Sequence, residues 1–423
     1  MAPTAETITE TVDKIAELKL SNSKLDSNPT TIEVELKNSF NIKPGYASQY
    51  SDQLPEQTKK RFAKHGIDIS KGYPKNPDTF PYFLDEGIKA TSRSPGWEEF
   101  QERGKFADKS KKNLFAKATE VKDLSKYIGT ELVGVKLSEL NEVELDELSL
   151  LISERVVVFF RNQDLSPQDQ IRIGGYLGHE IEKHPLGAHV PLPGIEGPTG
   201  ITTIWGKYYR KERPQAGGFR KRGGRGWHQD LVHLDGNGYA HLHLDAIPAT
   251  GGDTAFASLY GAYDKLSPAF QKFIEGLTVV QRSAHSYYDR ADPLSGPKYI
   301  EKEYPLVFTH PVTGWKSLYL NRIFTVRIKE LEPEESDIVL KHLFTIIETN
   351  LDIQARVNWA NTSQDRSLGA SVFWDNRIAN HYAIDDYDDD EDPRHGTRVV
   401  SLVSKLYLDP ESKSQRESLG LAS

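Results

Sequence analysis

Beyond residue 226 the sequence is a succession of short apolar runs separated by glycine and proline. The runs YAHLHLDAI, KSLYL, ASVFW and TRVVSLVSKLYL are rich in β-branched and aromatic residues, which favours strands over helices. Two segments that interrupt them, SPAFQKFIEGL and EESDIVLKHLFTIIETNL, have the spacing of apolar residues that is typical of helices. Numerous short strands with few long helices predict a mainly β fold with flanking helices, either a sandwich or a barrel.

The part of the chain from about residue 119 to Gly178 mixes both kinds of element. KYIGTELVGVKLSEL predicts a short strand, and ELDELSLLISERV has apolar residues at helical spacing. The continuous β-branched and aromatic run VVVFF, residues 156–160, predicts a buried strand. LSPQDQIRIGGYLG begins with Ser-Pro, a helix start, and ends at Gly178, so we expect a helix there.

Three segments are expected along the 423 residues. Residues 1–118 are polar and mixed, and YPKNPDTFPYFLDEG within them is rich in proline and aromatic residues without helical or strand periodicity. We therefore predict an N-terminal extension, partly irregular, that packs over the body as an arm. A catalytic domain is predicted over 119–410 and a C-terminal tail over 411–423.

Composition excludes several classes of function. The chain has no cysteine, so disulfides, thiolate metal sites, iron–sulfur clusters and cysteine nucleophiles are excluded, and any metal must be held by His, Asp or Glu. The net charge of -8 argues against binding to nucleic acid, which needs a basic face. No apolar run approaches the ~20 residues that span a bilayer, and the acidic N-terminus lacks the apolar core of a secretory signal. We expect a cytoplasmic protein without membrane contact.

The stretch GRGWHQDLVH places His228 two residues before Asp230. A third candidate ligand, His381, follows the predicted strand ASVFW in the stretch WDNRIANHYAIDDY. Two imidazoles and one carboxylate on one face of an octahedral ion leave positions open, which suits Fe(II) that binds a bidentate cosubstrate and then O₂. Taken alone, a His-x-Asp pair is more often an ordinary loop histidine with an acidic neighbour.

Two arginines and a threonine add candidate anion ligands. Arg394 and Arg398 are four residues apart in DPRHGTRVVSLV, so in an extended segment both side chains lie on the same face. Arginine is suited to bidentate capture of carboxylate or sulfonate groups. Thr254 falls at the start of another predicted strand.

These segments together resemble the TauD family of taurine/2-oxoglutarate dioxygenases, and in particular its fungal sulfonate-dioxygenase-like members. The resemblance covers residues 119–408, and its motifs stand in the order of the family. They are WHQD at 227–230, GGDTAFASLYGAYDKLSP at 251–268, THPVTGWKSLYLNRIFT at 309–325, and WDNRIANHYAIDDY at 374–387 with RHGTR at 394–398.

The resemblance implies a double-stranded β-helix, or jelly roll, with Fe(II) bound by His228, Asp230 and His381. It also implies that 2-oxoglutarate chelates the iron while its distal carboxylate is held by Arg394 and Thr254. O₂ would then be consumed, a substrate C–H oxidised, and succinate and CO₂ released. A carboxylate at the second ligand position argues against a halogenase, in which a small residue leaves room for chloride.

The resemblance further assigns substrate contacts. Arg398 matches the arginine that holds the anionic head of the substrate, His184 in KHPLG matches the histidine of an HP motif, and Phe324 matches an aromatic residue of the pocket. His233 stands where the family has an apolar aromatic residue. A pocket containing His184, His233 and Arg398 favours a small anionic or zwitterionic molecule.

Other departures concern substrate recognition more than the metal. Gly187 stands where taurine enzymes have a tyrosine, Gly224 replaces an asparagine, and Gln229 lies between the two ligands in place of Thr or Ser. The basic loop FRKRGGRG, 219–226, is either an ordinary surface loop or a lid that orders over the iron when substrate binds.

Three functions stay open from the sequence. The first is a dioxygenase acting on a small sulfonate, and the second is a dioxygenase with the same mechanism that tailors an amino acid or natural product. The third is an inactive jelly-roll protein that binds a small anion, against which the complete ligand set argues. The composition does not decide the assembly, so a homo-oligomer, dimeric or tetrameric, is left open.

Overall fold

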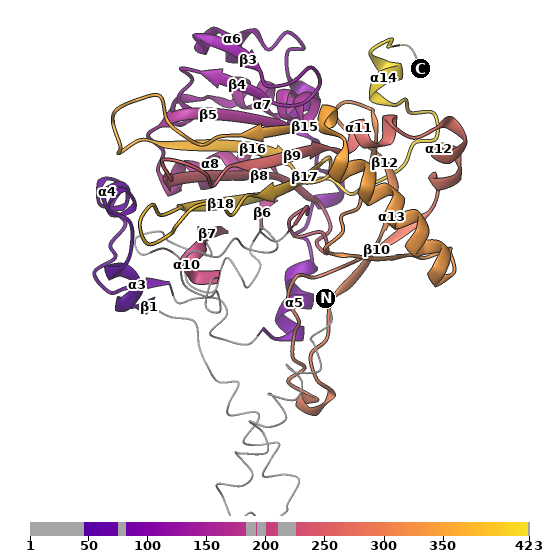
Figure 1. The fold of residues 1–423 in the computed structure, drawn as a ribbon, viewed down its shortest axis with the longest axis horizontal. Helices are drawn as coiled ribbons and strands as arrows, with labels where there is room; N and C mark the ends of the chain where they lie inside the picture. Colours follow the sequence, from indigo (N-terminus) through magenta and orange to yellow (C-terminus); the bar gives the residue numbers. More distant parts are fainter. Residues whose placement is uncertain (1–45, 75–81, 183–191, 193–199, 210–225, 422–423) are drawn as a thin grey trace, which may run out of the picture.

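A large β-sheet forms the centre of the molecule, and its order is β3-β4-β5-β16-β8-β18-β6, with β7 pairing to β18 as the eighth strand (Figure 1). Among the described residues of this sheet, β4 and β5 pair in parallel and the other strand pairs are antiparallel. The computed structural model describes residues 46–74, 82–182, 192, 200–209 and 226–421. The strands of the large sheet are β3 (Glu120–Asp123), β4 (Thr130–Val133), β5 (Val157–Gln163), β6 (Glu180–Ile181), β7 (Ile201–Trp205), β8 (Asn237–Ala246), β16 (Gly369–Asp375) and β18 (His395–Leu402).

A second, three-stranded sheet, β15-β9-β17, supplies the other wall of the fold. Its strands are β9 (Thr254–Ser258), β15 (Gln354–Val357) and β17 (Ala379–Ala383). A further three-stranded sheet, in the order β11-β10-β14, consists of β10 (Thr278–Arg282), β11 (Glu301–Pro305) and β14 (Thr325–Ile328). Two strand pairs complete the set: β12 (Val307–Thr309) with β13 (Lys316–Leu318), and β1 (Tyr46–Ala47) with β2 (Tyr73–Pro74). Each sequence run that was predicted to form a strand contains a strand in the structure, and Thr254 begins β9 as expected.

Helices flank the sheets and do not interrupt them. They are α3 (Ser48–Asp52), α4 (Glu56–Lys64), α5 (Leu84–Thr91), α6 (Lys112–Lys117), α7 (Glu142–Arg155), α8 (Pro167–Leu177), α10 (Gly206–Tyr209), α11 (Leu259–Asp264), α12 (Pro268–Ile274), α13 (Pro333–Thr349) and α14 (Gln415–Ser418), with short 3-10 turns between some of them. Local signals begin α7 and α8. Asn141 and Glu144 form a reciprocal capping box at α7, and the Ser166 side chain caps α8 before Pro167. The predicted end of α8 at Gly178 is confirmed.

The main core lies between the two sheets. Leu242 and Leu244 of β8 and Val372 of β16 are buried in it together with Phe256 of β9 and Ala355 of β15. Because side chains of a strand alternate between faces, every second residue of β8 and β16 enters this core. Two facing sheets closed around an apolar interior confirm the predicted mainly β jelly roll.

The opposite face of the large sheet is covered by helices. Val158 and Phe160 of β5 and Phe373 of β16 pack against apolar residues of α7 and α8, such as Leu148 and Ile173. This second core explains why β5 is apolar throughout its first half, since both of its faces are covered.

The described part of the N-terminal segment also packs closely on the body. Phe62 of α4 and Tyr73 of β2 share a third buried cluster with Trp205 of β7 and Val399 of β18. Helix α5 begins within the stretch YPKNPDTFPYFLDEG, which shows no helical periodicity; Asp85 and Glu86 lie in its first turn and favour a helix start. Gly87 makes the segment look unlike a helix, because glycine is a poor helix former. The glycine is needed for packing, since a Cβ added to it would lie 2.4 Å from the Tyr287 ring.

Within the described residues, no helix combines the length and the apolar character that crossing a bilayer requires.

Close strand packing at Gly396 yields a test of the β8–β18 contact. A Cβ at this position would lie 2.2 Å from the carbonyl oxygen of His243, whereas one at Gly175 of α8 would meet nothing within 4 Å. We expect Gly396→Ala to lower the free energy of unfolding by about 1–3 kcal/mol through overpacking. Gly175→Ala, the control, should raise it by about 0.5 kcal/mol because alanine favours a helix. Urea denaturation measures both, and equal stability of the two variants would contradict the close contact.

Candidate metal centre

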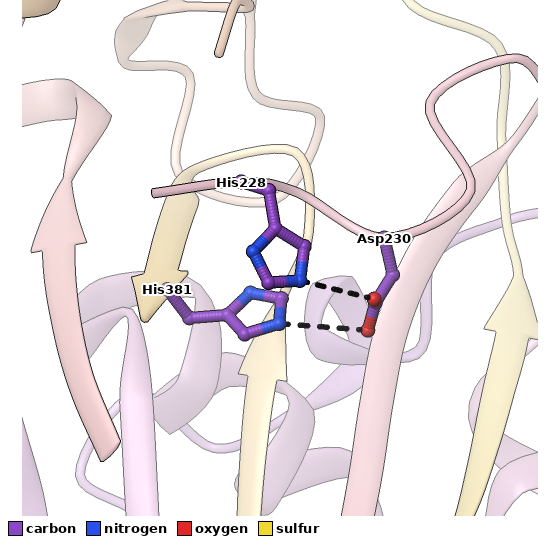
Figure 2. Close-up of side chains that lie close together, drawn as sticks. All are labelled: His228, Asp230 and His381. Carbon is purple, nitrogen blue, oxygen red and sulfur yellow. Dashed lines mark ion pairs between the residues drawn. The ribbon is translucent and has the colours of Figure 1, made fainter. Parts of the chain in front are cut away.

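His228, Asp230 and His381 meet at one end of the space between the two sheets (Figure 2). One ligand atom of each lies within 4.8 Å of the others. His228 Nε2 is 3.8 Å from Asp230 Oδ1, and His381 Nε2 is 3.7 Å from Asp230 Oδ2. Two ligand atoms that each lie about 2.1 Å from one ion are at most about 4.2 Å apart. Both separations therefore fit an ion shared by the three side chains.

Backbone pairing brings the two histidines together across 153 positions of sequence. His381 lies in the middle of β17, where it is paired with Phe256 of β9. His228 and His381 form a β-bridge, with N–H to O distances of 3.0 and 2.8 Å in the two directions. His228 Nδ1 also lies 2.8 Å from the carbonyl oxygen of Gly226. If Nδ1 donates its hydrogen to this carbonyl, Nε2 keeps its lone pair free to bind an ion between the three side chains.

The turn after β16 holds Asp230. The Asn376 side-chain oxygen accepts the N–H of Asp230 at 3.2 Å and the indole N–H of Trp374 at 2.8 Å. Gln229, between the two ligands, donates its amide to the carbonyl of Asn376 at 2.6 Å. Asn237 donates to the carbonyl of Asp230. The segments WHQD and WDN are therefore two sides of one hydrogen-bonded unit.

A buried ionic cluster fixes that turn from behind. Arg377, next to Asn376, donates to Glu102 at 2.7 Å and to Asp375 at 2.6 Å, and all three side chains are at most 1% exposed. His310 lies 3.0 Å from Asp375 and completes the cluster. Because an unpaired buried charge is costly, any other conformation of the turn that broke these contacts would be unfavourable.

The protonation states of the site suit a cation. Burial raises the pKa of Asp230, but electrostatic interaction with the Arg398 guanidinium, and with His381 and His228, more than offsets burial and lowers this pKa to about 2. Burial, with a further contribution from His228, lowers the pKa of His381 to about 3. At neutral pH the site thus presents a carboxylate and a neutral imidazole, the forms that bind metals.

Both predicted arginines point towards this end of the molecule. Arg398 Nη1 lies 2.8 Å from Asp230 Oδ2. Arg394 is buried, donates to the carbonyl of Gly252 at 3.0 Å and reaches the Thr254 hydroxyl at 3.3 Å. Arg394 thus lies beside Thr254, and Arg398 lies beside the ligand triad.

The predicted substrate contacts are placed unequally. The Phe324 ring lies edge-on to His228, with 6.2 Å between ring centroids. His233 is buried in the turn that follows Asp230, and its nearby charged groups include Arg93 and Lys302. The predicted contact His184 and the positions Gly187 and Gly224 lie outside the described residues, as does all of the proposed lid loop 219–226 except Gly226.

Some residues of the site were not predicted. Trp359 donates its indole N–H to the Thr254 hydroxyl at 3.1 Å, and the Arg394 guanidinium lies 5.5 Å from its ring centre. Asn376 and Arg377 fall within the quoted WDNR stretch, but the sequence offered no partner from which to assign them a role. Glu102 lies in the segment expected to be an arm. Each acts through a contact distant in sequence, which explains why local patterns did not reveal it.

The histidines of β8 are placed on the opposite face. His241 stacks on Phe373 with ring centroids 3.8 Å apart, and both His241 and His243 reach the Ser371 hydroxyl, at 3.2 and 2.9 Å. The expectation that this pair is structural agrees with these contacts.

Comparison with known proteins agrees with this fold and site. Residues 120–400 match the family described as taurine catabolism dioxygenase TauD, TfdA family. An alpha-ketoglutarate-dependent sulfonate dioxygenase of Saccharomyces cerevisiae is 30% identical over 360 residues, which cover 80% of this chain and 81% of that protein. An alpha-ketoglutarate-dependent dioxygenase of Penicillium expansum is 32% identical over 344 residues, covering 79% and 88%.

A solved structure supports the same assignment. The crystal structure of a taurine dioxygenase from Burkholderia xenovorans superposes with a TM-score of 0.54 at 28% identity, covering 70% of this chain and 92% of that one. The class defined is that of dioxygenases dependent on 2-oxoglutarate, the compound also called alpha-ketoglutarate. Within that class the chain belongs to the TauD, TfdA family, as its motifs predicted.

Buried His233 makes stability depend on pH. Burial, aided by the charges of His285, Arg93 and Lys302, lowers its pKa to about 3, against an ordinary value of 6.5. Between these values the unfolded chain binds a proton that the folded one does not, so stability is lost as the pH falls below 6.5. We expect this residue to lower the free energy of unfolding by about 2 kcal/mol at pH 5 relative to pH 7.5.

The variant His233→Phe, similar in size and without a titrating group, should lose this part of the pH dependence. Urea unfolding of both proteins at pH 7.5 and pH 5 provides the measurement. Parallel losses of stability in the two proteins would show that His233 is protonated in the folded state as easily as in the unfolded one.

Proposed function

We propose that the protein is an Fe(II)- and 2-oxoglutarate-dependent dioxygenase that oxidises a C–H bond of a small sulfonate. The single observation that supports this most is the placement of Arg398 beside the ligand triad and of Arg394 beside Thr254. Such a site offers one position for a cation and two guanidiniums for anions. The name of the Saccharomyces cerevisiae relative, a sulfonate dioxygenase, supports the substrate class.

In this proposal His228 and His381 hold Fe(II) through Nε2, and Asp230 holds it through a carboxylate oxygen. The iron, with 2-oxoglutarate and O₂, supplies the oxidant for the C–H bond. Arg394 and Thr254 bind the distal carboxylate of 2-oxoglutarate. Arg394 is itself oriented by the carbonyl of Gly252 and by Trp359, so its fork is preorganised for a carboxylate.

Arg398 is assigned to the sulfonate. One of its nitrogens contacts Asp230, while its buried Nε has no hydrogen-bond partner among the described residues. A guanidinium carries five N–H groups, so it retains donors for a second anion while it contacts Asp230. Phe324, beside His228, covers the site with an apolar ring and keeps water from the reacting carbon.

The overall reaction balances without a further reductant. A sulfonate R–CH₂–SO₃⁻ would be hydroxylated at the carbon that bears sulfur, one oxygen atom of O₂ entering the C–H bond and the other entering succinate. 2-Oxoglutarate loses CO₂ and supplies two electrons. The α-hydroxysulfonate then breaks its C–S bond and gives an aldehyde and sulfite.

Turnover of a substrate panel tests the proposal. The Fe(II)-loaded protein is incubated with 2-oxoglutarate, O₂ and small sulfonates or amino acids, and succinate and sulfite are both measured. We expect one or more sulfonates to stimulate succinate formation with equimolar sulfite. His381→Ala, which removes a ligand, should lower the rate by more than about 100-fold, beyond the usual effect of losing an outer partner of a ligand.

A tailoring dioxygenase that acts on an amino acid or natural product is the second candidate. It is favoured by His233, a buried polar residue where the family resemblance expects an apolar aromatic one. Succinate formation stimulated by amino acids alone, without sulfite, would replace the sulfonate proposal with this one. Absence of iron binding by the purified protein would contradict both. Cytoplasmic location and homo-oligomeric assembly stay predictions.

A further inference from the structure

We propose that Arg61, in helix α4 of the N-terminal segment, is a positioning residue for the strand that binds 2-oxoglutarate. Through Asp245, His395 and Thr397 it holds the start of β18, so that Arg394 and Arg398 face the metal centre. This inference rests on the proposed function, because it takes Arg394 as the anchor of the cosubstrate.

Arg61 is buried and each of its nitrogens has a partner. Its side chain is 3% exposed. Nη1 donates to Asp245 Oδ2 of β8 at 2.8 Å and to the Thr397 hydroxyl of β18 at 3.1 Å. Nη2 donates to the Gln170 side chain at 2.9 Å, and Nε donates to the carbonyl of Leu165 at 2.9 Å. One side chain from the N-terminal segment thus connects β8, β18 and α8.

Asp245 is the centre of this cluster. Besides Arg61 it accepts the hydroxyl of Thr58 at 2.7 Å, and its Oδ1 lies 2.7 Å from Nδ1 of His395. The other ring nitrogen of His395 lies 2.7 Å from the Tyr73 hydroxyl. The N-terminal segment therefore reaches His395, the residue that directly follows Arg394, in two ways: directly through Tyr73, and through Asp245 with Thr58 and Arg61.

Alternation along β18 couples this cluster to the site. His395 and Thr397 face the N-terminal segment, while Arg394 and Arg398 face Thr254 and Asp230 on the other side. Displacement of His395 therefore displaces Arg394, its immediate neighbour.

The ladder at this end of β18 is irregular on the side of β8, whereas the pairing of residues 395–399 with β7 runs without a shift. The register between β18 and β8 shifts between His395 and Gly396, which pair with Ala246 and Leu244. A bulge locally disrupts the ladder and bends the strand. At this bulge, the bonds from Arg61 to Asp245 and Thr397 span the two strands.

Binding of 2-oxoglutarate to the full-length, Mn(II)-loaded protein tests the inference. Calorimetric titration without O₂ gives its Kd for each variant, a Mn(II) titration tests the metal ligands, and thermal unfolding reports stability. Arg61→Met removes the charge and all four bonds at similar size. The matched control is Arg103→Met, which removes another Arg–Asp pair of the N-terminal segment, with Asp146 of α7 at 2.8 Å, away from β18.

We expect Arg61→Met to raise the Kd of 2-oxoglutarate by about tenfold, a loss like that of an outer partner of a metal ligand. Its Mn(II) affinity should stay within about twofold of the original, as the triad is untouched, and Arg61→Lys, which keeps the charge, should recover part of the loss. Arg103→Met should lower the thermal stability and leave the Kd unchanged. An Arg61→Met protein that is less stable but binds 2-oxoglutarate normally would overturn the inference.

Two further variants keep the test decisive. Should Arg61→Met fail to fold, Thr58→Val removes a single bond to Asp245, and we expect a Kd about threefold higher; an unchanged Kd overturns the inference. Arg394→Met tests the assignment on which it rests. Normal binding by Arg394→Met would refute that assignment and the inference together, whereas weak binding by Arg394→Met with normal binding by Arg61→Met refutes the inference alone.

Discussion

The pairing of β8 with β18 is the contact on which the rest of the molecule depends. Gly396 permits the two strands to approach closely, since any larger residue would meet the backbone of β8. Because side chains alternate between the two faces of the sheet, each strand has one set of residues that faces the main core or the site and another set that faces outward. The first set includes Arg398 on β18 and leucines of the main core on β8, and Arg394 directly precedes β18. A shift by one residue would exchange the two sets and remove the site.

The outward set of β8 carries an unusual amount of buried polarity. Asp245 at one end is paired with Arg61, and Tyr239 at the other end lies 3.5 Å from Glu102, the partner of Arg377. Both partners come from the segment that precedes the catalytic domain. Buried pairs of this kind add little net stability, because desolvation offsets attraction, but each disfavours every arrangement that would leave one charge alone. The N-terminal segment thereby helps to fix two parts of the site: Arg61 the strand next to Arg394 and Arg398, and Glu102 the turn after β16 that holds Asp230.

Sequence patterns revealed the site better than its supports. The triad and the two arginines were candidates because few residue types bind metals or anions, and the resemblance of their motifs to the TauD family gave them and Thr254 their expected roles. Arg61 and Glu102 were not predicted, since nothing local distinguishes a buried arginine or glutamate from a solvated one. Helix α5 was missed for a related reason: its Gly87 is required by close packing against Tyr287, which lies 200 positions away.

The residues proposed to bind iron and 2-oxoglutarate and the residues proposed to contact the substrate are held in the fold in different ways. The groups proposed to bind iron and 2-oxoglutarate are held by strand pairing, by the WDN turn and by buried ion pairs, so small changes elsewhere leave them in place. Two residues proposed to meet the substrate, His233 and Phe324, lie in turns. Turns accept substitutions that strands do not, because fewer hydrogen bonds depend on them. Such a fold can retain the same oxidation reaction while its substrate changes. Arg398 differs from the other residues proposed to contact the substrate, because it lies on a strand and contacts a proposed metal ligand. The preference for an anion should therefore outlast the preference for any particular carbon skeleton.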